Sequence, residues 1–414
     1  MLPPSLTHGR LSLGSLSQEG KPEPVLTFSF KVDGEGNMAD YDVKAGLIRN
    51  VTRVDYDSVD ELLGTGSIQL GRPFEAPRNP PAPRVPVLET KDIENIRLIH
   101  NLIRRYRKRS RQILNPFVFS VPLANLTVSE RPLYGAPTTP ASNPLYYRGF
   151  PSLSYEVSSQ KVLERGSRLI IAECMKAASR IASRWFSAKG VPMLRRSARP
   201  PVALEDSRDV EKLEALMDED GFVDHAEYLK VKLHIPPVQY LLDPAMHWAM
   251  GIPEGEGYVR VTSPLRRYND LVAHWQIKDV LLRPTARSRL FTPGWLTSYA
   301  TEVIAQERLW KHSELSHRTH WALMYIKRFL DHPNPPSDRV DPLRSLRAYV
   351  TEPSKKRDLL TDQYSCHVPS LGLPGTFVTP RGTDIPVGQQ LDVRIKDVQV
   401  GLKSLFLLEL CGRS

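Results

Sequence analysis

The sequence predicts an α+β protein in which a larger part with long helices is followed by a small β-barrel. Apolar residues recur at helical spacing over residues 91–114, 159–187 and 295–330, as they do in amphipathic helices. From Leu346 onward the pattern changes to short alternating stretches separated by turn residues, which is typical of small barrels. A segment rich in proline and aspartate, residues 333–341, separates the two patterns.

The first elements are predicted to be a β-hairpin and the start of a helix. Residues 25–32 alternate apolar and polar side chains, which predicts a half-buried strand. The sequence DGEG at residues 33–36 is a turn signal, and residues 41–51 supply the second strand. The stretch TRVDYDSVDELL then has the pattern of a helix start. The proline-rich residues 71–87 are expected to form an exposed linker or insertion.

The predicted helix over residues 91–114 has an apolar face and a strongly basic face. The basic residues are Arg104, Arg105, Arg107, Lys108, Arg109 and Arg111. Such a face either lies free in water or binds phosphate groups, and the sequence favours neither. Arg105 and Lys108 are taken as candidate phosphate contacts.

The middle of the chain alternates between irregular and helical patterns. Residues 115–155 are rich in Pro, Ser and Tyr and are expected to be irregular, whereas residues 159–187 are expected to form one long helix. Residues 198–236 begin with prolines and are expected to be an insertion. An acidic patch in this segment is expected to be a solvated loop rather than a metal site; its residues are Asp218, Glu219, Asp220 and Asp224.

The C-terminal strands resemble an OB-fold of the RNA-binding type found in ribosomal proteins. The turn Leu371–Gly375 (LGLPG) and the stretch VGQQLDVRIKDVQV fit that pattern. An unrelated β-barrel that makes no RNA contact is the alternative, because many small barrels share this arrangement of strands and turns.

Charge and cysteine content restrict the class of protein. The formal net charge is +10, and a basic balance favours a polyanionic partner, of which nucleic acid is the first candidate. The three cysteines, Cys174, Cys366 and Cys411, are far apart and show no metal-ligand spacing, which fits a reducing compartment. We expect no membrane span and no secretory signal, because the sequence has no long apolar run.

The stretch YVRVTSPLRRYNDLVAH, residues 258–274, is the most informative part of the chain. We expect Thr262 or Ser263 to cap a helix over residues 269–281, with Pro264 in its first turn. Backbone N–H groups and two guanidiniums would then face one point, which suits a phosphate group. An ordinary capped surface helix with solvated arginines is the alternative.

This stretch closely resembles the signature of the ribonuclease II (RNB) family of 3′→5′ exoribonucleases. The matching residues are Tyr258, Thr262, Ser263, Pro264, Arg266, Arg267, Tyr268, Asp270 and His274. Further similar segments are MLPPSLTHGRLSLGSL, the hairpin, RVDYDSV, IAECM and MLRRSARPP. The chain departs from the family pattern at Ala172, Ser179, Arg195 and Ala198. The resemblance implies a partial RNB catalytic domain, a mixed sheet with long helices, over residues 1–332 and an OB-fold RNA-binding domain over residues 342–414.

The resemblance also implies roles for individual residues. Arg266 corresponds to the family's catalytic arginine, which stabilises the scissile phosphate. Tyr56 and Glu173 correspond to residues near the RNA 3′ end, where a ring can stack and a carboxylate can accept from a ribose hydroxyl. The alternatives are a buried core tyrosine and an ordinary helical glutamate. The further RNA-binding candidates are Arg267, Tyr268, Arg105 and Lys108, and Asp270 and His274 are expected to be structural supports.

The implied activity is processive 3′→5′ hydrolysis of single-stranded RNA to nucleoside 5′-monophosphates by the full-length form. In the family, clustered aspartates that precede the MLPP segment hold Mg²⁺. Those ligands are absent from this chain, so we assign it no metal ligand and leave its own catalytic activity open. The alternatives are a non-catalytic RNA-binding regulator on the RNB scaffold and a truncated inactive fragment. An RNA helicase or an RNA-degrading complex is a possible partner, and the compartment is expected to be mitochondrial or cytoplasmic.

Overall fold

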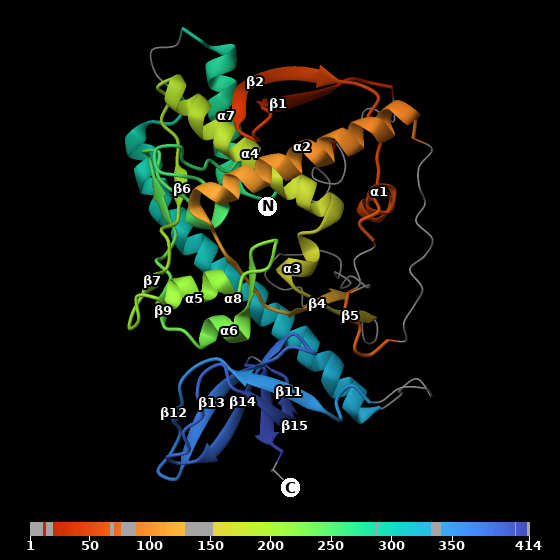
Figure 1. Ribbon diagram of the computed structural model, residues 1–414, viewed down its shortest axis with the longest axis vertical. Coiled ribbons are helices and arrows are strands. Elements are labelled where there is room, and N and C mark those ends of the chain that lie inside the picture. The colour runs from red at the N-terminus through yellow and green to blue at the C-terminus, as the bar shows by residue number, and fades with distance from the viewer. Residues whose placement is uncertain are drawn as a thin grey trace, which may run out of the picture.

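The computed structural model has the predicted α+β architecture, with a helical body and a barrel at one end (Figure 1). It describes residues 11–13, 20–66, 70–75, 88–128, 152–285, 289–332, 341–401 and 403–411. In the body the strands pair two at a time, in antiparallel ribbons and in one parallel pair, β3 with β8. In the barrel they form one continuous sheet.

The predicted N-terminal hairpin and helix are confirmed. Strand β1 (Glu23–Val32) pairs antiparallel with β2 (Met38–Ile48). Helix α1 (Tyr56–Leu63) is capped by Asp55, whose carboxylate accepts from the backbone N–H of Ser58 at 2.8 Å. Helix α2 (Thr90–Leu114) follows and lies beside α4 (Figure 1).

The prediction of one helix over residues 159–187 is wrong, because the chain forms α3 (Gln160–Leu163) and α4 (Gly166–Ala188). Gly166 starts α4 with φ +55°, a conformation that glycine adopts without a Cβ clash. The carboxylate of Asp60 accepts from the backbone N–H of Ser167 at 2.6 Å, and a Cβ on Gly166 would overlap it. A contact across more than a hundred residues therefore breaks the helix.

Residues 115–155 are less irregular than predicted. They include β3 (Val118–Ser120), β4 (Leu123–Val128) and the start of β5 (Leu153–Ser158), which pairs with β4. The start of the predicted linker 71–87 is also ordered, because Gly71 bridges Val157 and Phe74 is buried. Residues 76–87 and 129–151 lie outside the described residues.

The segment 198–236 folds against the body, and its acidic patch is only partly solvated: Glu219 and Asp224 are exposed, whereas Asp218 and Asp220 form ion pairs with other elements. Asp218 accepts from the backbone N–H groups of Asp220 and Phe222 at 3.0 and 2.9 Å, and Asp224 caps a short helix. The elements of this region are β6 (Arg195–Ser197), β7 (Val202–Ala203), α5 (Asp209–Ala215), β8 (Phe222–Asp224), α6 (His225–Leu229), β9 (Leu233–His234), β10 (Gln239–Leu241) and the 3₁₀ helix η3 (Trp248–Met250).

Two further helices complete the body. Helix α7 (Tyr268–Leu282) follows the TSP turn, and α8 (Pro293–Asp331) confirms the predicted last helix. Helix α8 extends from the body to the barrel (Figure 1). None of the helices in the described residues combines the length and the hydropathy that crossing a bilayer requires.

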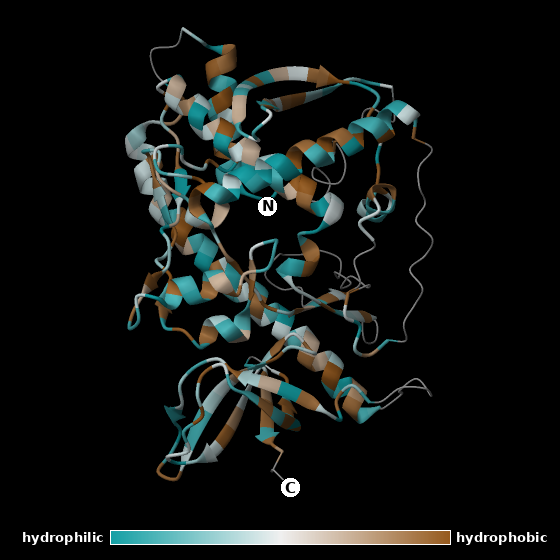
Figure 2. Ribbon diagram, in the orientation of Figure 1, coloured by the Kyte–Doolittle hydropathy of each residue, from teal (hydrophilic) through white to brown (hydrophobic). Residues whose placement is uncertain are grey.

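The C-terminal strands form a closed barrel. The order β11-β13-β14-β16-β15 returns to β11, with β14 and β16 parallel and the other pairs antiparallel. This order is that of an OB-fold, a five-stranded barrel. Brown and teal alternate along its strands in Figure 2, as expected when one face is buried. The strands are β11 (Leu346–Val350), β12 (Lys355–Lys356), β13 (Thr361–Val368), β14 (Leu373–Pro380), β15 (Gln390–Gln399) and β16 (Leu405–Leu410).

One hydrophobic core joins the barrel to the body. It includes the barrel interior, the C-terminal end of α8, and Ala124 and Tyr155 of the β4–β5 ribbon. The hydroxyl of Tyr155 donates to the carbonyl of Leu371 at 2.5 Å, and the backbone N–H of Ala124 donates to Gly372 at 3.0 Å. The ribbon therefore fixes the barrel to the body.

We expect Gly372→Ala to lower the free energy of unfolding by about 3 kcal/mol. Gly372 has φ +62°, and a Cβ there would overlap the backbone of Leu123 and Ala124. Gly382 is the matched control, because it has φ +82° with no other heavy atom within 4 Å of its Cβ position. Gly382→Ala should cost about 1–2 kcal/mol from backbone strain alone. Equal losses in denaturant unfolding would contradict the close contact at Gly372.

The buried His367 makes part of the stability depend on pH. Its Nε2 lies 2.8 Å from the carbonyl oxygen of Pro122, and burial lowers its pKa to about 4. Its unfolded pKa is about 6.5, so the unfolded chain binds more protons as pH falls from about 6.5 to 4. The free energy of unfolding should fall over that window, by up to about 3 kcal/mol for this group. Between pH 7.5 and 4.5 the free energy of unfolding of the His367→Asn variant should fall less than that of the wild type. An identical fall in the two proteins would contradict the assignment.

Candidate functional site

The TSP turn is held by backbone groups and by Asp270. The backbone N–H groups of Arg266 and Arg267 donate to the carbonyl of Ser263 at 3.2 and 3.0 Å. The carboxylate of Asp270 accepts from the N–H of Ser263 at 2.8 Å, and His274 Nε2 lies 2.6 Å from the carbonyl of Val261. Asp270 and His274 thus hold the backbone of the turn.

The predicted cap of this helix is wrong. Helix α7 begins at Tyr268, and its N-cap is Arg267, with no side-chain capping bond. Neither Thr262 nor Ser263 caps it, because Pro264 and its neighbours form a separate turn before the helix. The buried Asp270 bonds backward to this turn instead, which a pattern of local capping residues does not reveal.

The two adjacent arginines have different environments. Arg266 is exposed, and within the described part of the chain its guanidinium makes no hydrogen bond or ion pair. Arg267 is half-buried, with Nη1 3.9 Å from the carboxylate of Asp270, and burial lowers its pKa. Burial raises the pKa of Asp270. Tyr268 has 53% of its surface exposed. Of these two guanidiniums, that of Arg266 is therefore the more accessible to a phosphate group.

Residues that were not among the predicted site residues lie behind the turn. Arg196 Nη1 lies 3.4 Å from His247 Nε2, and burial lowers the pKa of His247 to about 3, so this imidazole is neutral at pH 7. Arg260 forms an ion pair with Glu307, which also accepts from the hydroxyl of Tyr240 at 2.7 Å. The signal in the sequence that could have identified Arg260 is its position just before the TSP motif.

Several buried polar atoms near the turn have no hydrogen-bond partner among the described residues. They are Arg196 Nε, His247 Nδ1, both amide atoms of Asn269, and Asp270 Oδ1. Such atoms are rare in protein interiors unless a water, an ion or a ligand satisfies them. Their concentration here marks the region as a candidate site for a polar ligand.

Tyr56 lies at the start of α1, beside the N-terminus of α4. Its ring is 45% exposed, so it is not the buried core tyrosine of the alternative interpretation. The guanidinium carbon of Arg168 lies 4.5 Å from the ring centroid. The Tyr56 carbonyl accepts from the hydroxyl of Ser167 at 3.1 Å. Ser167 and Arg168 thus hold Tyr56 in place while its ring still presents surface to a ligand.

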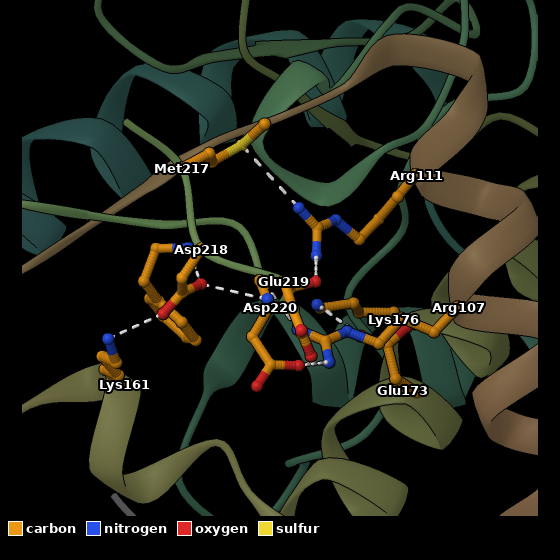
Figure 3. Close-up of polar contacts among 10 residues, drawn as sticks. Arg107, Arg111, Lys161, Glu173, Lys176, Met217, Asp218, Glu219 and Asp220 are labelled. Carbon is orange, nitrogen blue, oxygen red and sulfur yellow. Dashed lines mark hydrogen bonds and ion pairs between the residues drawn. The ribbon is translucent and has the colours of Figure 1, made fainter. Parts of the chain in front are cut away.

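Glu173 lies in a pocket between α2 and α4 and is almost fully buried (Figure 3). Its carboxylate forms an ion pair with Lys176 at 2.9 Å and lies 3.6 Å from Arg107. Arg107 also pairs with Asp220 at 2.7 Å. Glu173 is not an ordinary solvent-facing helical glutamate, but both cations already neutralise the carboxylate expected to accept from a ribose hydroxyl.

The acidic turn of residues 218–220 pairs with basic side chains, as Figure 3 shows. Lys161 contacts Asp218 at 2.7 Å, and Arg111 donates to the carbonyl of Glu219 at 3.0 Å. Carboxylates occupied in this way do not offer the ligand set that Mg²⁺ requires. No group of three His, Cys, Asp or Glu side chains suited to a metal ion occurs in the described ranges. The described residues therefore do not fit the family's metal site.

The basic face of α2 is divided between two environments. Arg107 and Arg111 point into the pocket with Glu173, whereas Arg105 and Lys108 are exposed and make no ion pair within the described ranges. A Cβ on Gly36 of the hairpin turn would lie 2.6 Å from the carbonyl oxygen of Arg105, so the hairpin packs closely against this part of α2. The candidate residues therefore form separate groups, at the TSP turn, at Tyr56, in the Glu173 pocket and on the outer face of α2.

Comparison with known proteins decides the family. The RNB domain model matches residues 1–283, more than half of the chain. The chain belongs to the RNB family. The mitochondrial exoribonuclease II of Schizosaccharomyces pombe is 26% identical over 336 residues, which cover 79% of this chain and 33% of that relative. The Saccharomyces cerevisiae protein of the same name is 23% identical over 362 residues, covering 85% of this chain and 32% of its own length.

Solved ribonuclease structures share the fold. An active-site mutant of the Dss1 exoribonuclease of Candida glabrata matches with a TM-score of 0.67 and 18% identity, covering 95% of this chain and 43% of that chain. RNase R of Mycoplasma genitalium in complex with ribose-methylated single-stranded RNA matches with a TM-score of 0.63 and 12% identity, covering 95% and 58%. This RNB chain thus spans about a third of the curated relatives and about half of the solved ones.

Proposed function

We propose that this chain is the RNA-binding C-terminal part of an RNB exoribonuclease that degrades single-stranded RNA from the 3′ end. The observation that carries the proposal is Arg266, exposed and without an ion pair on the RNB signature turn. Its guanidinium would bind the scissile phosphate and stabilise the negative charge that develops during hydrolysis. Arg267 would support the turn through Asp270, and Tyr268 would contact RNA beside it.

The other candidate residues are assigned to the bound strand. Tyr56 would stack on a base or ribose near the 3′ end, and Arg105 and Lys108 would attract the phosphate backbone. For Glu173 we propose a contact with the ribose through the pocket that it lines, made together with Lys176. We propose residues 1–332 as the RNB domain and residues 342–414 as an OB-fold RNA-binding domain, whose sheet order supports the assignment.

Processive hydrolysis to nucleoside 5′-monophosphates is proposed for the full-length form. Mg²⁺ would serve there, as is general for RNB nucleases, but no step is assigned to it because the described residues do not gather its ligands. The exoribonuclease names of the relatives favour this function over a non-catalytic regulator. Those relatives also support a mitochondrial location, and an RNA helicase or RNA-degrading complex is proposed as partner.

Salt dependence of RNA binding tests the proposal. Binding that depends on phosphate contacts weakens as salt is added. The logarithm of the association constant falls with log[salt], with a slope of about −0.7 per phosphate contact for a single strand. With four or more such contacts, the Kd of the 414-residue chain for a labelled single-stranded RNA should rise about 50-fold or more between 50 and 200 mM salt. Binding that is absent at low salt, or that does not respond to salt, would contradict the proposal.

A further inference from the structure

Five aromatic side chains, on α7, just before α8 and on α8, form a closed cycle of ring contacts. Tyr268 and Trp275 belong to α7, Phe291 precedes α8, and Trp295 and Tyr299 belong to α8. In that order the successive ring centroids lie 5.9, 6.3, 4.5 and 5.0 Å apart, and Tyr299 returns to Tyr268 at 5.6 Å. The rings from Trp275 to Tyr299 are nearly parallel, with interplanar angles of 28°, 34° and 20°.

Three of these rings present surface to solvent. Tyr268 is 53%, Trp275 36% and Trp295 39% exposed, and we call these three residues the aromatic platform. Phe291 and Tyr299 are half-buried and pack between the platform and the hydrophobic core. Large aromatic side chains are usually buried, and a contiguous exposed apolar patch marks a binding surface. The platform therefore has rigid, pre-positioned rings but no partner among the described residues that covers them.

The charges around the platform favour a polyanion on one side. Arg266 lies two residues before Tyr268, and Lys278 lies one helical turn after Trp275; both are exposed. Burial raises the pKa of Tyr299, and the charges of Glu302, Glu307 and Asp270 add to this effect, so acidic side chains lie near the Tyr299 end of the cycle. A ligand with flat rings and negative groups would place its rings on the platform and its negative groups toward Arg266 and Lys278.

We propose that the platform binds a nucleobase of single-stranded RNA by stacking, while the adjoining phosphates are held by Arg266 and Lys278. This inference rests on the proposed function and adds a base-binding subsite to it. Stacking of bases on aromatic side chains depends little on sequence and strengthens binding by about 5- to 150-fold per base. The site would align the strand beside the arginine that receives the scissile phosphate.

The test separates base contacts from phosphate contacts. Fluorescence anisotropy of the 414-residue chain would give Kd values for oligouridylate and for an abasic ribose-phosphate oligomer of the same length. We expect the wild type to prefer the oligomer with bases by about tenfold or more. In the double variant Trp275→Ala/Trp295→Ala, the ratio of the Kd for the abasic oligomer to the Kd for oligouridylate should be at least about fivefold smaller than in the wild type. Its affinity for the abasic oligomer should stay unchanged, which also shows that the variant is folded.

Trp310 supplies the matched control. It is 62% exposed on the same helix, fifteen residues beyond Trp295 and hence about 22 Å away along the axis. Trp310→Ala should keep the wild-type preference. A double variant that binds RNA with its preference intact would overturn the platform and leave the proposed function standing. If neither oligomer binds the wild type, the proposed function fails and the platform with it. Shielding of Trp275 and Trp295 from acrylamide in RNA-free full-length protein would overturn the inference in favour of a covering polypeptide.

Discussion

Replacing Arg266 by alanine should lower the single-turnover rate of 3′→5′ RNA degradation by about 10²–10³-fold in the full-length form. RNA affinity should change by less than about threefold, because the other contacts hold the strand and this guanidinium acts mainly on charge that develops in the transition state. Rapid-quench measurements at saturating enzyme would give the rate, and anisotropy would give the affinity. Arg266→Lys should recover part of the rate, since it restores the charge but not the two-pronged geometry.

Arg208→Ala is the control, because Arg208 has a side chain that is 74% exposed and pairs only locally with Asp206. It should leave both the rate and the affinity unchanged. A variant at Arg266 that loses RNA binding but cleaves at the wild-type single-turnover rate would contradict the assignment. That result would make Arg266 a binding residue and leave the signature turn without its proposed catalytic group.

Replacing Arg180 by alanine should lower the free energy of unfolding by about 3–5 kcal/mol, which is typical of breaking a buried ion pair. Arg180 is 5% exposed. Its Nε and Nη2 donate to one oxygen of Glu256 at 2.8 and 2.6 Å, and Nη1 donates to the hydroxyls of Tyr106 and Ser110 at 2.8 and 3.3 Å. These bonds join α2, α4 and the loop before Tyr258, so their loss leaves buried polar groups unpaired.

Arg184 provides the control within the same network. It pairs with the other oxygen of Glu256 at 2.6 Å, but its side chain is 29% exposed. Arg184→Ala should therefore cost about 1 kcal/mol or less. Urea unfolding of both variants compares the two pairs directly. Equal losses would mean that burial does not decide the strength of these contacts.

The sequence predicted best those elements whose pattern is local. The hairpin of β1 and β2, helix α2 and the barrel strands follow from the alternation or helical spacing of their own residues. The break before α4 was missed because it depends on Asp60, which lies far away in the chain. The acidic turn was predicted to be solvated because its partners, Arg107 and Lys161, come from other elements.

Only the part of the candidate site that lies within one short motif could be predicted from the sequence. The TSP turn, Arg266 and Asp270 share a single stretch of sequence, so their proximity could be anticipated. The prediction of its helix cap was wrong because Pro264 and its neighbours form a separate turn before the helix begins at Tyr268. The contact of Glu173 with Arg107 and the aromatic cycle require the packing of separate helices, which periodicity within one helix does not specify.

A gel assay on the purified 414-residue chain tests the central claim most directly. The chain would be incubated with 5′-labelled single-stranded RNA and Mg²⁺, beside an EDTA control, and the same samples would be run on a native gel. The account predicts salt-sensitive binding with no shortening of the RNA, because the described residues bring the RNB signature turn into place but gather no metal site. A Mg²⁺-dependent ladder that shortens from the 3′ end would contradict it and would mean that these 414 residues contain a working acidic site.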